Sequence, residues 1–438
     1  GAFEAHGYDD NRCRDGEGCT VPHSNQGLGV SGMKQAQQIL STYAVDMFGI
    51  ASALYELGGL VVMHDASGCN STYSTHDEPR WYDTPSMVYI SGLCEIDTIQ
   101  GNDMRLIDEV AAAAEETCPA FIAVGGSPMP NAIGTDFRAI ERILRQRTGL
   151  PVLSFRTDGI HSYLPGAGEA YLRLVKEFVK SPRVKPQKPA VRVNILGLTP
   201  LDFSVVGNAT ELKKLIEEAG LKVHSSWSMG DSLDNMSLAA EGDVNAVVSS
   251  TGLYAAQYMK EKYDIPYVVG IPAGRAAVEP WLKALKSGDS TYLTGLTGEE
   301  SLRKVKFAMA DLNAWKNESR QSDDSCDILL IGEPVRILSL RRYLEIEKGI
   351  KNIRLICPLA DAPNLLLKDM DIISVEDELR QACKAAKKII ADPIYAHLLP
   401  KEEKRFVSFP HEAYSGRRYR DEMPLFIGGF IEEWAKIL

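Results

Sequence analysis

The stretch Gly59-Leu-Val-Val-Met-His-Asp-Ala-Ser-Gly-Cys69 carries an apolar run into a short turn that ends in a cysteine. The run Leu60–Met63 is continuous rather than alternating, which is typical of a strand buried on both faces of a parallel sheet. Open α/β sheets place their chemistry at the carboxyl ends of such strands. The stretch therefore predicts an α/β fold with Cys69 at a reactive strand end.

The same pattern repeats along the chain. Short runs rich in Val, Ile and Leu alternate with segments of helical periodicity, and this alternation predicts parallel sheets with helices on both faces. Besides 60–63, the predicted strands are 87–90, 120–124, 152–155, 191–196, 222–226, 246–249, 267–270, 328–331, 354–356, 372–374, 388–391 and 406–409. Three doubly wound, Rossmann-like parallel-sheet domains fit this series better than one large sheet.

Two polar joints divide the series. The Pro- and Lys-rich segment 181–189 cannot continue a helix, and the polar segment 317–325 precedes a fresh strand with a glycine turn. The predicted parts are an irregular arm at 1–41, a first α/β domain with the candidate cluster cysteines at 42–189, a middle α/β domain at 190–325 and a C-terminal α/β domain at 326–438.

The composition narrows the class of protein. Hydrophobic residues make up 45% and charged residues 24% of the 438 residues, as in soluble globular proteins. The net charge of −11 argues against nonspecific binding to nucleic acid. No run reaches the roughly 18 apolar residues of a membrane span. The first residues do not resemble a secretory signal, and eight cysteines are too sparse for a disulfide framework, so we expect a reduced, cytoplasmic setting.

Three cysteines lie beside predicted strands of the first domain. Cys69 and Cys94 each follow a strand and are expected at one edge of the sheet, whereas Cys118 precedes a strand and is expected at the opposite edge. A [4Fe–4S] cluster needs several thiolates that converge on one pocket, and cysteines from two subunits would complete such a set across a two-fold axis. Cys19 in the arm is a further candidate ligand. The alternative for each cysteine is a buried, inert thiol.

Four other residues are candidates for a site. His411 follows Pro410 at a strand end and is a candidate catalytic acid, because histidine titrates near neutral pH; a hydrogen-bonded loop histidine is the alternative. Ser249 and Ser250 are candidate cofactor-binding residues, with helix capping as the ordinary role. Arg275 precedes a helix, where anionic groups bind, and a surface ion pair is the alternative. The absence of GxxxxGK[ST] and of GxGxxG after a first strand argues against nucleotide hydrolysis and nicotinamide binding.

Six segments, in this order, resemble the component 1 subunits of nitrogenase, their cofactor-assembly scaffolds and the catalytic subunits of dark-operative protochlorophyllide reductase. The segments are His64–Cys69, Glu95–Gly101, Ile133–Asp136, Val193–Gly197, Tyr263–Gly274 and Phe409–Gly416. The resemblance implies a homodimer or paired homologous subunits with a [4Fe–4S]-type cluster at their interface. It also implies an ATP-dependent iron–sulfur reductase as electron donor, and a cavity between the three domains beneath the loop that contains His411.

The departures from the family pattern limit the chemistry. Only Cys69 matches a family cluster cysteine. The preceding family cysteine falls at Ala44–Met47 and the following one near Ser127, and neither place has a thiol. The family's cofactor-anchoring cysteine falls at Val247–Thr251, also without a thiol, which argues against a molybdenum cofactor and against dinitrogen reduction. The leading hypothesis is a nitrogenase-like oxidoreductase subunit with an unidentified substrate; the alternatives are a metallocofactor-assembly scaffold and a metal-free α/β binding protein.

Overall fold

The computed structural model describes residues 41–101, 103–181, 190–289, 292, 325–363, 370–400 and 403–438. They belong to one compact unit, Gln38–Leu438. Apart from Ser41, the predicted N-terminal arm lies outside the described residues, and so does Cys19. The predicted domain boundaries at 189 and 325 fall at the ends of undescribed segments and stay predictions.

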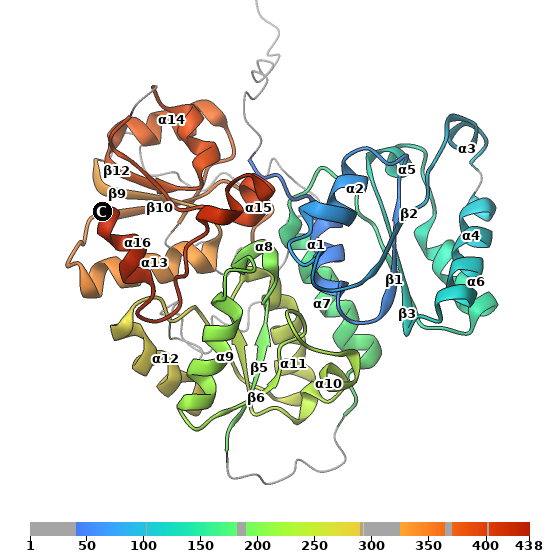
Figure 1. Cartoon of the computed structure of the whole chain (residues 1–438), viewed down its shortest axis with the longest axis horizontal. Helices are drawn as coiled ribbons and strands as arrows, with labels where there is room; N and C mark the ends of the chain where they lie inside the picture. The colour runs from blue at the N-terminus through green and yellow to red at the C-terminus, as the bar shows by residue number, and fades with distance from the viewer. Residues whose placement is uncertain are drawn as a thin grey trace, which may run out of the picture. The chain divides into compact units, whose positions relative to one another are not determined.

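Three parallel sheets form the framework of the described ranges (Figure 1). Their strand orders are β2-β1-β3-β4, β6-β5-β7-β8 and β11-β10-β9-β12-β13, and neighbouring strands within each sheet pair in parallel. The strands are β1 (Gly59–His64), β2 (Met87–Ile90), β3 (Phe121–Gly126), β4 (Val152–Phe155), β5 (Arg192–Leu196), β6 (Lys222–Ser225), β7 (Val244–Val247), β8 (Tyr267–Val269), β9 (Cys326–Ile331), β10 (Ile353–Cys357), β11 (Asp371–Ile372), β12 (Ala386–Ala391) and β13 (Phe406–Ser408). The predicted α/β fold with three parallel sheets is confirmed.

Every strand predicted from an apolar run is present, and its ends differ from the prediction by no more than two residues. The agreement has a simple cause. The central strands β1, β3 and β5 are buried at every position, so most of their residues are apolar. The polar residues inside β5 have partners: Arg192 pairs with Asp243, and Asn194 donates to Asn245.

Helices cover both faces of the first sheet. One core cluster joins that sheet to α1 (Asp46–Leu54) and α7 (Tyr163–Phe178), and a separate cluster joins it to α4 (Asp103–Thr117) and α6 (Phe137–Thr148). Helices α1 and α7 approach closely because glycine is present at their crossing: a Cβ on Gly166 would lie 1.9 Å from the Asp46 carbonyl oxygen.

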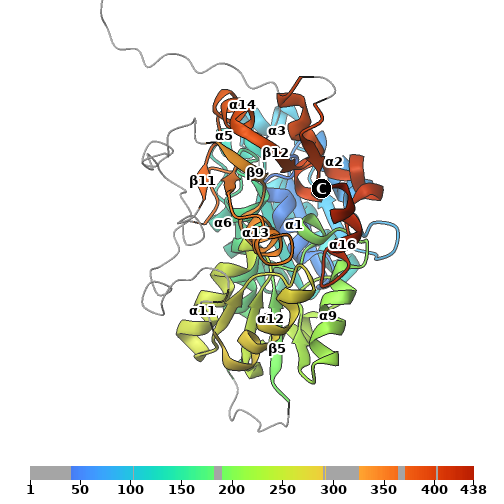
Figure 2. The ribbon, with the colours of Figure 1, turned by 90° about the vertical axis from the view of Figure 1, so that its left-hand side faces the viewer.

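The other helices connect the remaining strands. Figure 2 shows α9 and α11 on opposite sides of β5 in the middle sheet. The bounds are α8 (Pro200–Phe203), α9 (Asn208–Glu218), α10 (Leu233–Ser237), α11 (Leu253–Tyr263), α12 (Arg275–Ser287), α13 (Pro334–Glu347), α14 (Glu376–Ala385), α15 (Glu412–Ser415) and α16 (Ile431–Trp434). None of the helices in the described ranges combines the length and the apolar character of a membrane span.

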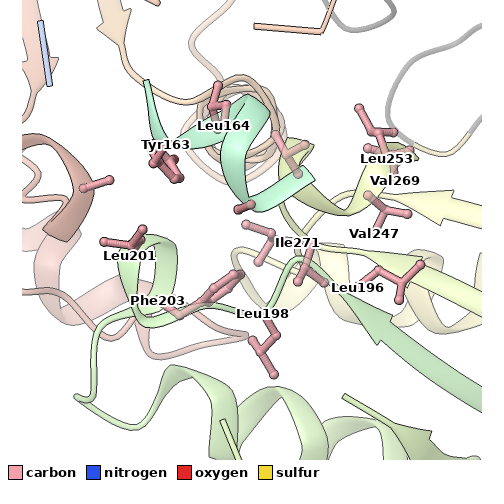
Figure 3. Close-up of a cluster of buried hydrophobic side chains, with 14 of the residues drawn as sticks. Tyr163, Leu164, Leu196, Leu198, Leu201, Phe203, Val247, Leu253, Val269 and Ile271 are labelled. Atoms are coloured by element: carbon pink, nitrogen blue, oxygen red, sulfur yellow. The ribbon is translucent and has the colours of Figure 1, made fainter. Parts of the chain in front are cut away.

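The start of α7 packs over the carboxyl edge of the middle sheet. Figure 3 shows Tyr163 and Leu164 beside buried side chains at the carboxyl ends of β5, β7 and β8 and in the segments that follow. The middle-sheet side chains labelled there are Leu196, Leu198, Leu201, Phe203, Val247, Leu253, Val269 and Ile271. A helix of the first sheet thus lies against strand ends of the middle sheet, where polar groups from several segments meet.

Candidate functional site

Hydrogen bonds tie together the carboxyl ends of three strands in the first sheet. Asp65, directly after β1, accepts a backbone hydrogen bond from Leu93, which follows β2, at 2.8 Å. The carboxylate of Asp65 accepts hydrogen bonds from the Ser127 hydroxyl, after β3, and from the Asn70 amide, both at 2.6 Å. The segments that follow β1, β2 and β3 therefore lie side by side, as expected for a parallel sheet.

Cys69 is the first residue of the short helix α2 (Cys69–Thr72). The turn between β1 and α2 contains Ser67 and Gly68, with φ angles of 107° and 55°. Positive φ is easy for glycine and costly for serine, so the chain bends sharply at a place where the sequence predicts a reactive turn. The backbone of Cys69 lies just beyond the carboxyl end of β1.

Cys94 lies at the same edge, and Cys118 does not. Cys94 is exposed and precedes α3 (Glu95–Gln100); its thiol donates to the Asp97 carboxylate at 2.8 Å, and Arg105 Nη1 approaches the sulfur at 3.7 Å. Cys118 is also exposed but precedes β3, at the amino end of the sheet. This edge offers too few thiols for an iron–sulfur cluster, so the residues fit such a group only together with ligands from a paired subunit or from Cys19.

A second polar cluster, the three-sheet junction, is buried where segments from all three sheets meet. Asp202 of α8, His411 just before α15 and Tyr163 at the start of α7 form its centre. Nε2 of His411 and the hydroxyl of Tyr163 lie 3.0 and 2.5 Å from the same oxygen, Oδ1 of Asp202. All three side chains are almost completely buried.

A buried carboxylate and a buried guanidinium extend the three-sheet junction. Glu333 caps α13 by accepting from the Arg336 amide at 2.7 Å, and it also accepts from the Ser250 amide and hydroxyl at 2.9 and 2.5 Å. Arg336 donates to the Asp202 carbonyl at 2.8 Å and to the Pro410 carbonyl at 2.6 Å. One arginine thus joins the C-terminal sheet, the middle sheet and the loop that contains His411.

Burial shifts the protonation of these groups toward their neutral forms. It raises the pKa of Asp202 and of Glu333 above the ordinary carboxyl value, and it raises the pKa of Asp392, which accepts from the His411 amide at 2.7 Å, to about 6. Burial and the nearby Arg336 hold the pKa of His411 well below its usual range. Near neutral pH the junction therefore contains a neutral imidazole beside carboxyl groups that hold protons easily.

The junction is closed in this structure. The pocket that borders His411 has a volume of about 10 Å³, room for one water at most. Arg417 and Arg420 hold the segment after His411 to the π-helical segment Tyr73–Asp77, which follows α2. Arg417 pairs with Asp77 at 3.0 Å, and Arg420 donates to the Asp77 carbonyl at 2.9 Å. Arg420 also pairs with the buried Glu412 at 2.5 Å.

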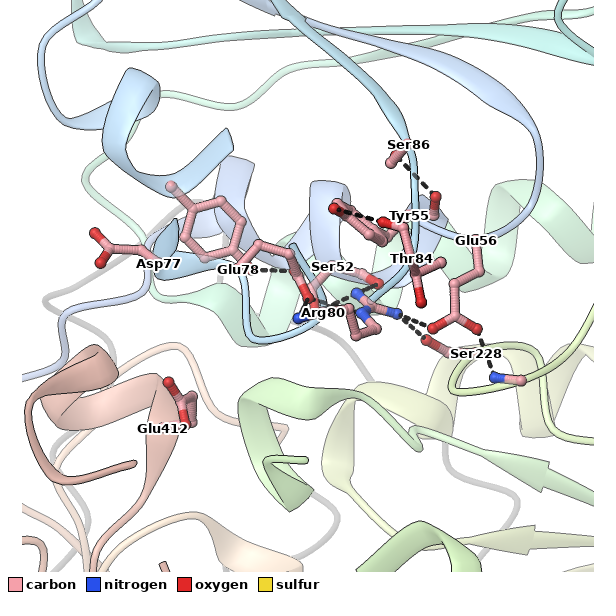
Figure 4. A network of polar contacts seen from close by, with 12 residues as sticks. Ser52, Tyr55, Glu56, Asp77, Glu78, Arg80, Thr84, Ser86, Ser228 and Glu412 are labelled. Carbon is pink, nitrogen blue, oxygen red and sulfur yellow. Dashed lines mark hydrogen bonds and ion pairs between the residues drawn. The ribbon is translucent and has the colours of Figure 1, made fainter. Parts of the chain in front are cut away.

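Arg80 joins the loop after α2 to the middle sheet (Figure 4). Its guanidinium pairs with Glu78 at 2.7 Å and with Glu56 at 3.0 Å. It also donates to the Ser52 carbonyl at 2.8 Å and to the hydroxyl of Ser228, after β6, at 3.0 Å. The side chain is only 5% exposed. The four contacts therefore take the place of nearly all the water that would otherwise surround the guanidinium.

The structure brings together three of the four polar candidates. Ser250 bonds to Glu333, Ser249 caps the turn that begins at Ser250 and lowers the pKa of Asp202 against the larger effect of burial, and His411 bonds to Asp202. Arg275 is exposed at the start of α12, and its side chain lies against Gly429, apart from these hydrogen bonds. Whether any candidate takes part in catalysis or cofactor binding stays a prediction.

Sequence reasoning missed Asp202, Glu333 and Arg336. The first two follow strands and stand at helix starts beside proline, in Thr-Pro-Leu-Asp202 and Glu333-Pro, a pattern typical of helix N-termini. That signal locates each residue on its own element. It does not reveal that the elements converge.

The comparisons with known proteins agree on one family. The family described as "Nitrogenase component 1 type Oxidoreductase" matches residues 48–388. A nitrogenase iron-molybdenum cofactor biosynthesis protein, NifE, of Methanosarcina barkeri is 27% identical over 184 residues, which cover 40% of this chain and 39% of NifE. The nitrogenase molybdenum-iron protein alpha chain of Clostridium pasteurianum is 24% identical over 246 residues, 55% of this chain and 44% of that protein.

A third relative is one of the subunits of light-independent protochlorophyllide reductase from Chlorella vulgaris, 31% identical over 188 residues, which cover 41% of this chain and 36% of that protein. The matches thus span less than half the length of these curated relatives. The solved structure "Nitrogenase Cp1 at pH 6.5" superposes with a TM-score of 0.65 at 15% identity, covering 93% of this chain and 94% of that one, which shows a shared fold. The family match spans most of the chain, and the chain belongs to the nitrogenase component 1 type oxidoreductase family.

Proposed function

We propose that this chain is a subunit of a nitrogenase-like oxidoreductase that reduces a small, unidentified substrate at the three-sheet junction. The observation that carries the proposal is the buried set of Asp202, His411 and Tyr163, joined at 3.0 and 2.5 Å. Reduction of an unsaturated bond consumes protons as well as electrons. A buried carboxyl group with a raised pKa beside a neutral imidazole is suited to supplying those protons.

Electrons enter, in this proposal, at the carboxyl edge of the first sheet. Cys69 and Cys94, with Cys19 and ligands from a paired subunit, would hold a [4Fe–4S]-type cluster there. When bound, the cluster supplies low-potential electrons one at a time. Support comes from the hydrogen bonds that join the ends of β1, β2 and β3 and from the exposed thiol of Cys94. An ATP-dependent iron–sulfur reductase, as in the family, would deliver the electrons.

Protons move through His411 in this scheme. Its neutral ring carries one proton, and Asp202 either accepts a hydrogen bond from Nε2 or, when protonated, donates to it. When Asp202 is protonated, the ring proton is on Nδ1. In the proposed step this proton passes to the substrate while Asp202 gives its own proton to Nε2, so the imidazole stays neutral. The resulting charge on Asp202 is stabilised by the hydroxyl of Tyr163 and by the nearby guanidinium of Arg336. The serines at 249 and 250 help to set the positions of these carboxyl groups.

Substrate entry needs movement, because the pocket beside His411 has a volume of only about 10 Å³. The segment that must move begins at His411 and is held by the ion pair of Arg417 with Asp77 and by the hydrogen bonds of Arg420 to the carbonyls of His76 and Asp77. Opening this segment would expose the imidazole and make room above it. The proposal therefore includes a closed state, which is the one described, and an open state.

A cofactor-assembly scaffold is the second candidate function. Two observations favour it: the similarity to the cofactor biosynthesis protein of M. barkeri, and the closed junction. A scaffold would use the same cysteines without reducing a substrate at His411.

Anaerobic purification with iron and sulfide analysis tests the electron site. We expect iron in the wild-type protein, loss of iron in Cys69→Ser and Cys94→Ser, and normal iron in Cys118→Ser, which removes an exposed thiol at the opposite edge. An iron-free wild-type protein, or equal iron in Cys94→Ser and Cys118→Ser, would refute the assignment of the site. The iron-free outcome would leave the metal-free binding protein.

Turnover assays with a reductase then separate enzyme from scaffold. For an enzyme, we expect His411→Gln to retain iron and lose most of its substrate reduction. A scaffold would show no turnover in either protein and would pass its metal to an acceptor protein instead.

A further inference from the structure

An arginine-lined pocket lies on the outside of the first sheet, away from the residues of the proposed function. Its volume is about 640 Å³, within the range of about 300–1,000 Å³ that is usual for small-molecule sites. It is lined by α6 and α7 through Arg138, Glu141, Arg142, Arg145, Gln146 and Arg173. The lining has a net charge of three positive units on a chain whose net charge is −11.

The pocket lies along β4, the edge strand of the first sheet. Arg145 donates to the Val152 carbonyl at 2.7 Å. Glu141 accepts from the amide and the hydroxyl of Ser154 at 3.1 and 2.5 Å. These side chains occupy hydrogen-bonding groups of the strand that would otherwise face a partner strand. A ligand that adds a strand to this edge is therefore disfavoured. A ligand of this pocket would instead be bound by the side chains that line it.

The free polar groups of the pocket are positively charged donors. Glu141 is shared between Arg173 at 2.7 Å and Arg145 at 3.5 Å, and Arg145 also pairs with Glu177 at 2.9 Å. By contrast, Arg138 and Arg142 form no ion pair with any residue in the described ranges. The two lie one helical turn apart, about 6 Å between their Cβ atoms, so two guanidinium groups without partners project along the same stripe of α6.

We propose that this pocket binds a small polyphosphate anion, through Arg138 and Arg142 with support from Arg145 and Arg173. Guanidinium groups bind phosphate oxygens with two parallel hydrogen bonds. A chain of linked phosphates presents several negative charges over the short distance between neighbouring turns of a helix. A single carboxylate or orthophosphate has fewer charges and fewer acceptor oxygens to share between the two arginines, so it should bind more weakly than a chain of phosphates. The site is independent of the redox function proposed above.

Isothermal titration of the full-length protein at low ionic strength tests the proposal. The titrants are inorganic tripolyphosphate, orthophosphate, ATP without magnesium, and a glutamate-rich peptide. We expect tripolyphosphate to bind with one site per chain and much more tightly than orthophosphate. Each of Arg138→Gln and Arg142→Gln should weaken binding by about tenfold, the usual effect of losing one strong charge-assisted contact. Tighter binding of ATP would identify a nucleotide as the source of the phosphates, and equal or weaker binding would identify the phosphate chain alone.

Arg147→Gln is the matched control. Arg147 is on the same helix and carries the same charge, but it pairs with Asp108 and does not line this pocket. We expect its affinity for tripolyphosphate to equal that of the wild type. The proposal is overturned if tripolyphosphate does not bind, if Arg138→Gln and Arg142→Gln bind it as tightly as the wild type, or if Arg147→Gln weakens binding equally. Binding of the acidic peptide that tripolyphosphate fails to displace would overturn it as well, in favour of a protein partner.

Discussion

Replacing Arg80 by methionine should destabilise the folded protein severely. The substitution keeps the length of the side chain and removes a cation that contacts Glu56 at 3.0 Å and Glu78 at 2.7 Å. Both carboxylates are buried, with side chains 9% and 1% exposed, and both would remain without the cation. Breaking a buried ion pair in this way costs about 3–5 kcal/mol. We expect a loss in the free energy of unfolding of that size.

Urea unfolding followed by circular dichroism measures this loss. Arg147→Met is the control, because its partner is the exposed Asp108, with side chains 44% and 59% exposed; such pairs contribute less than about 1 kcal/mol. Adding Glu56→Gln and Glu78→Gln to Arg80→Met should restore part of the loss. The reasoning fails if Arg80→Met is no less stable than the Arg147→Met control, or if the added glutamine substitutions restore none of the loss.

Three further outcomes are expected. Gly166→Ala should lower stability by about 3 kcal/mol in urea unfolding, because the new Cβ would lie 1.9 Å from the Asp46 carbonyl oxygen; unchanged unfolding would contradict the close helix crossing. Burial raises the pKa of Asp392 to about 6, so the folded protein holds this proton more tightly than the unfolded chain, and thermal stability should fall as the pH rises toward about 6. Asp392→Asn should flatten this dependence of the melting temperature on pH; the same dependence in the variant would contradict the raised pKa. Arg417→Gln should speed hydrogen exchange at the amides of residues 412–416, because it breaks the ion pair with Asp77; wild-type exchange rates would show that this pair does not hold the segment closed.

The strands could be predicted from the sequence because their burial is a local property of the chain. A strand such as β5, Arg192–Leu196, is covered by helices on both faces and buried throughout. Its sequence is mostly apolar, and although Arg192 and Asn194 are buried polar residues, the apolar run between polar, glycine-containing turns still locates it within one or two residues. The motif that ends in Cys69 was informative for the same reason, because a strand, a turn and a helix start are adjacent in sequence.

The three-sheet junction depends on contacts that no local pattern contains. Asp202 and His411 are 209 positions apart in the chain, and Ser250 and Glu333 are 83 apart. Glutamate and aspartate at helix starts are ordinary capping residues when each is considered alone. They become a buried, proton-holding cluster only because α7 packs over the middle sheet and Arg336 reaches across to Asp202.

The sequence by itself determined the class of fold, the order of strands and helices along the chain, and the family to which the chain belongs. These depend on periodicity and on short motifs, which neighbouring residues carry. The tertiary structure alone decided which charged groups lose their water and which partners they meet. Desolvation and hydrogen bonding act over a few ångströms in space, whatever the separation along the chain, and they set the protonation of His411, Asp202 and Glu333.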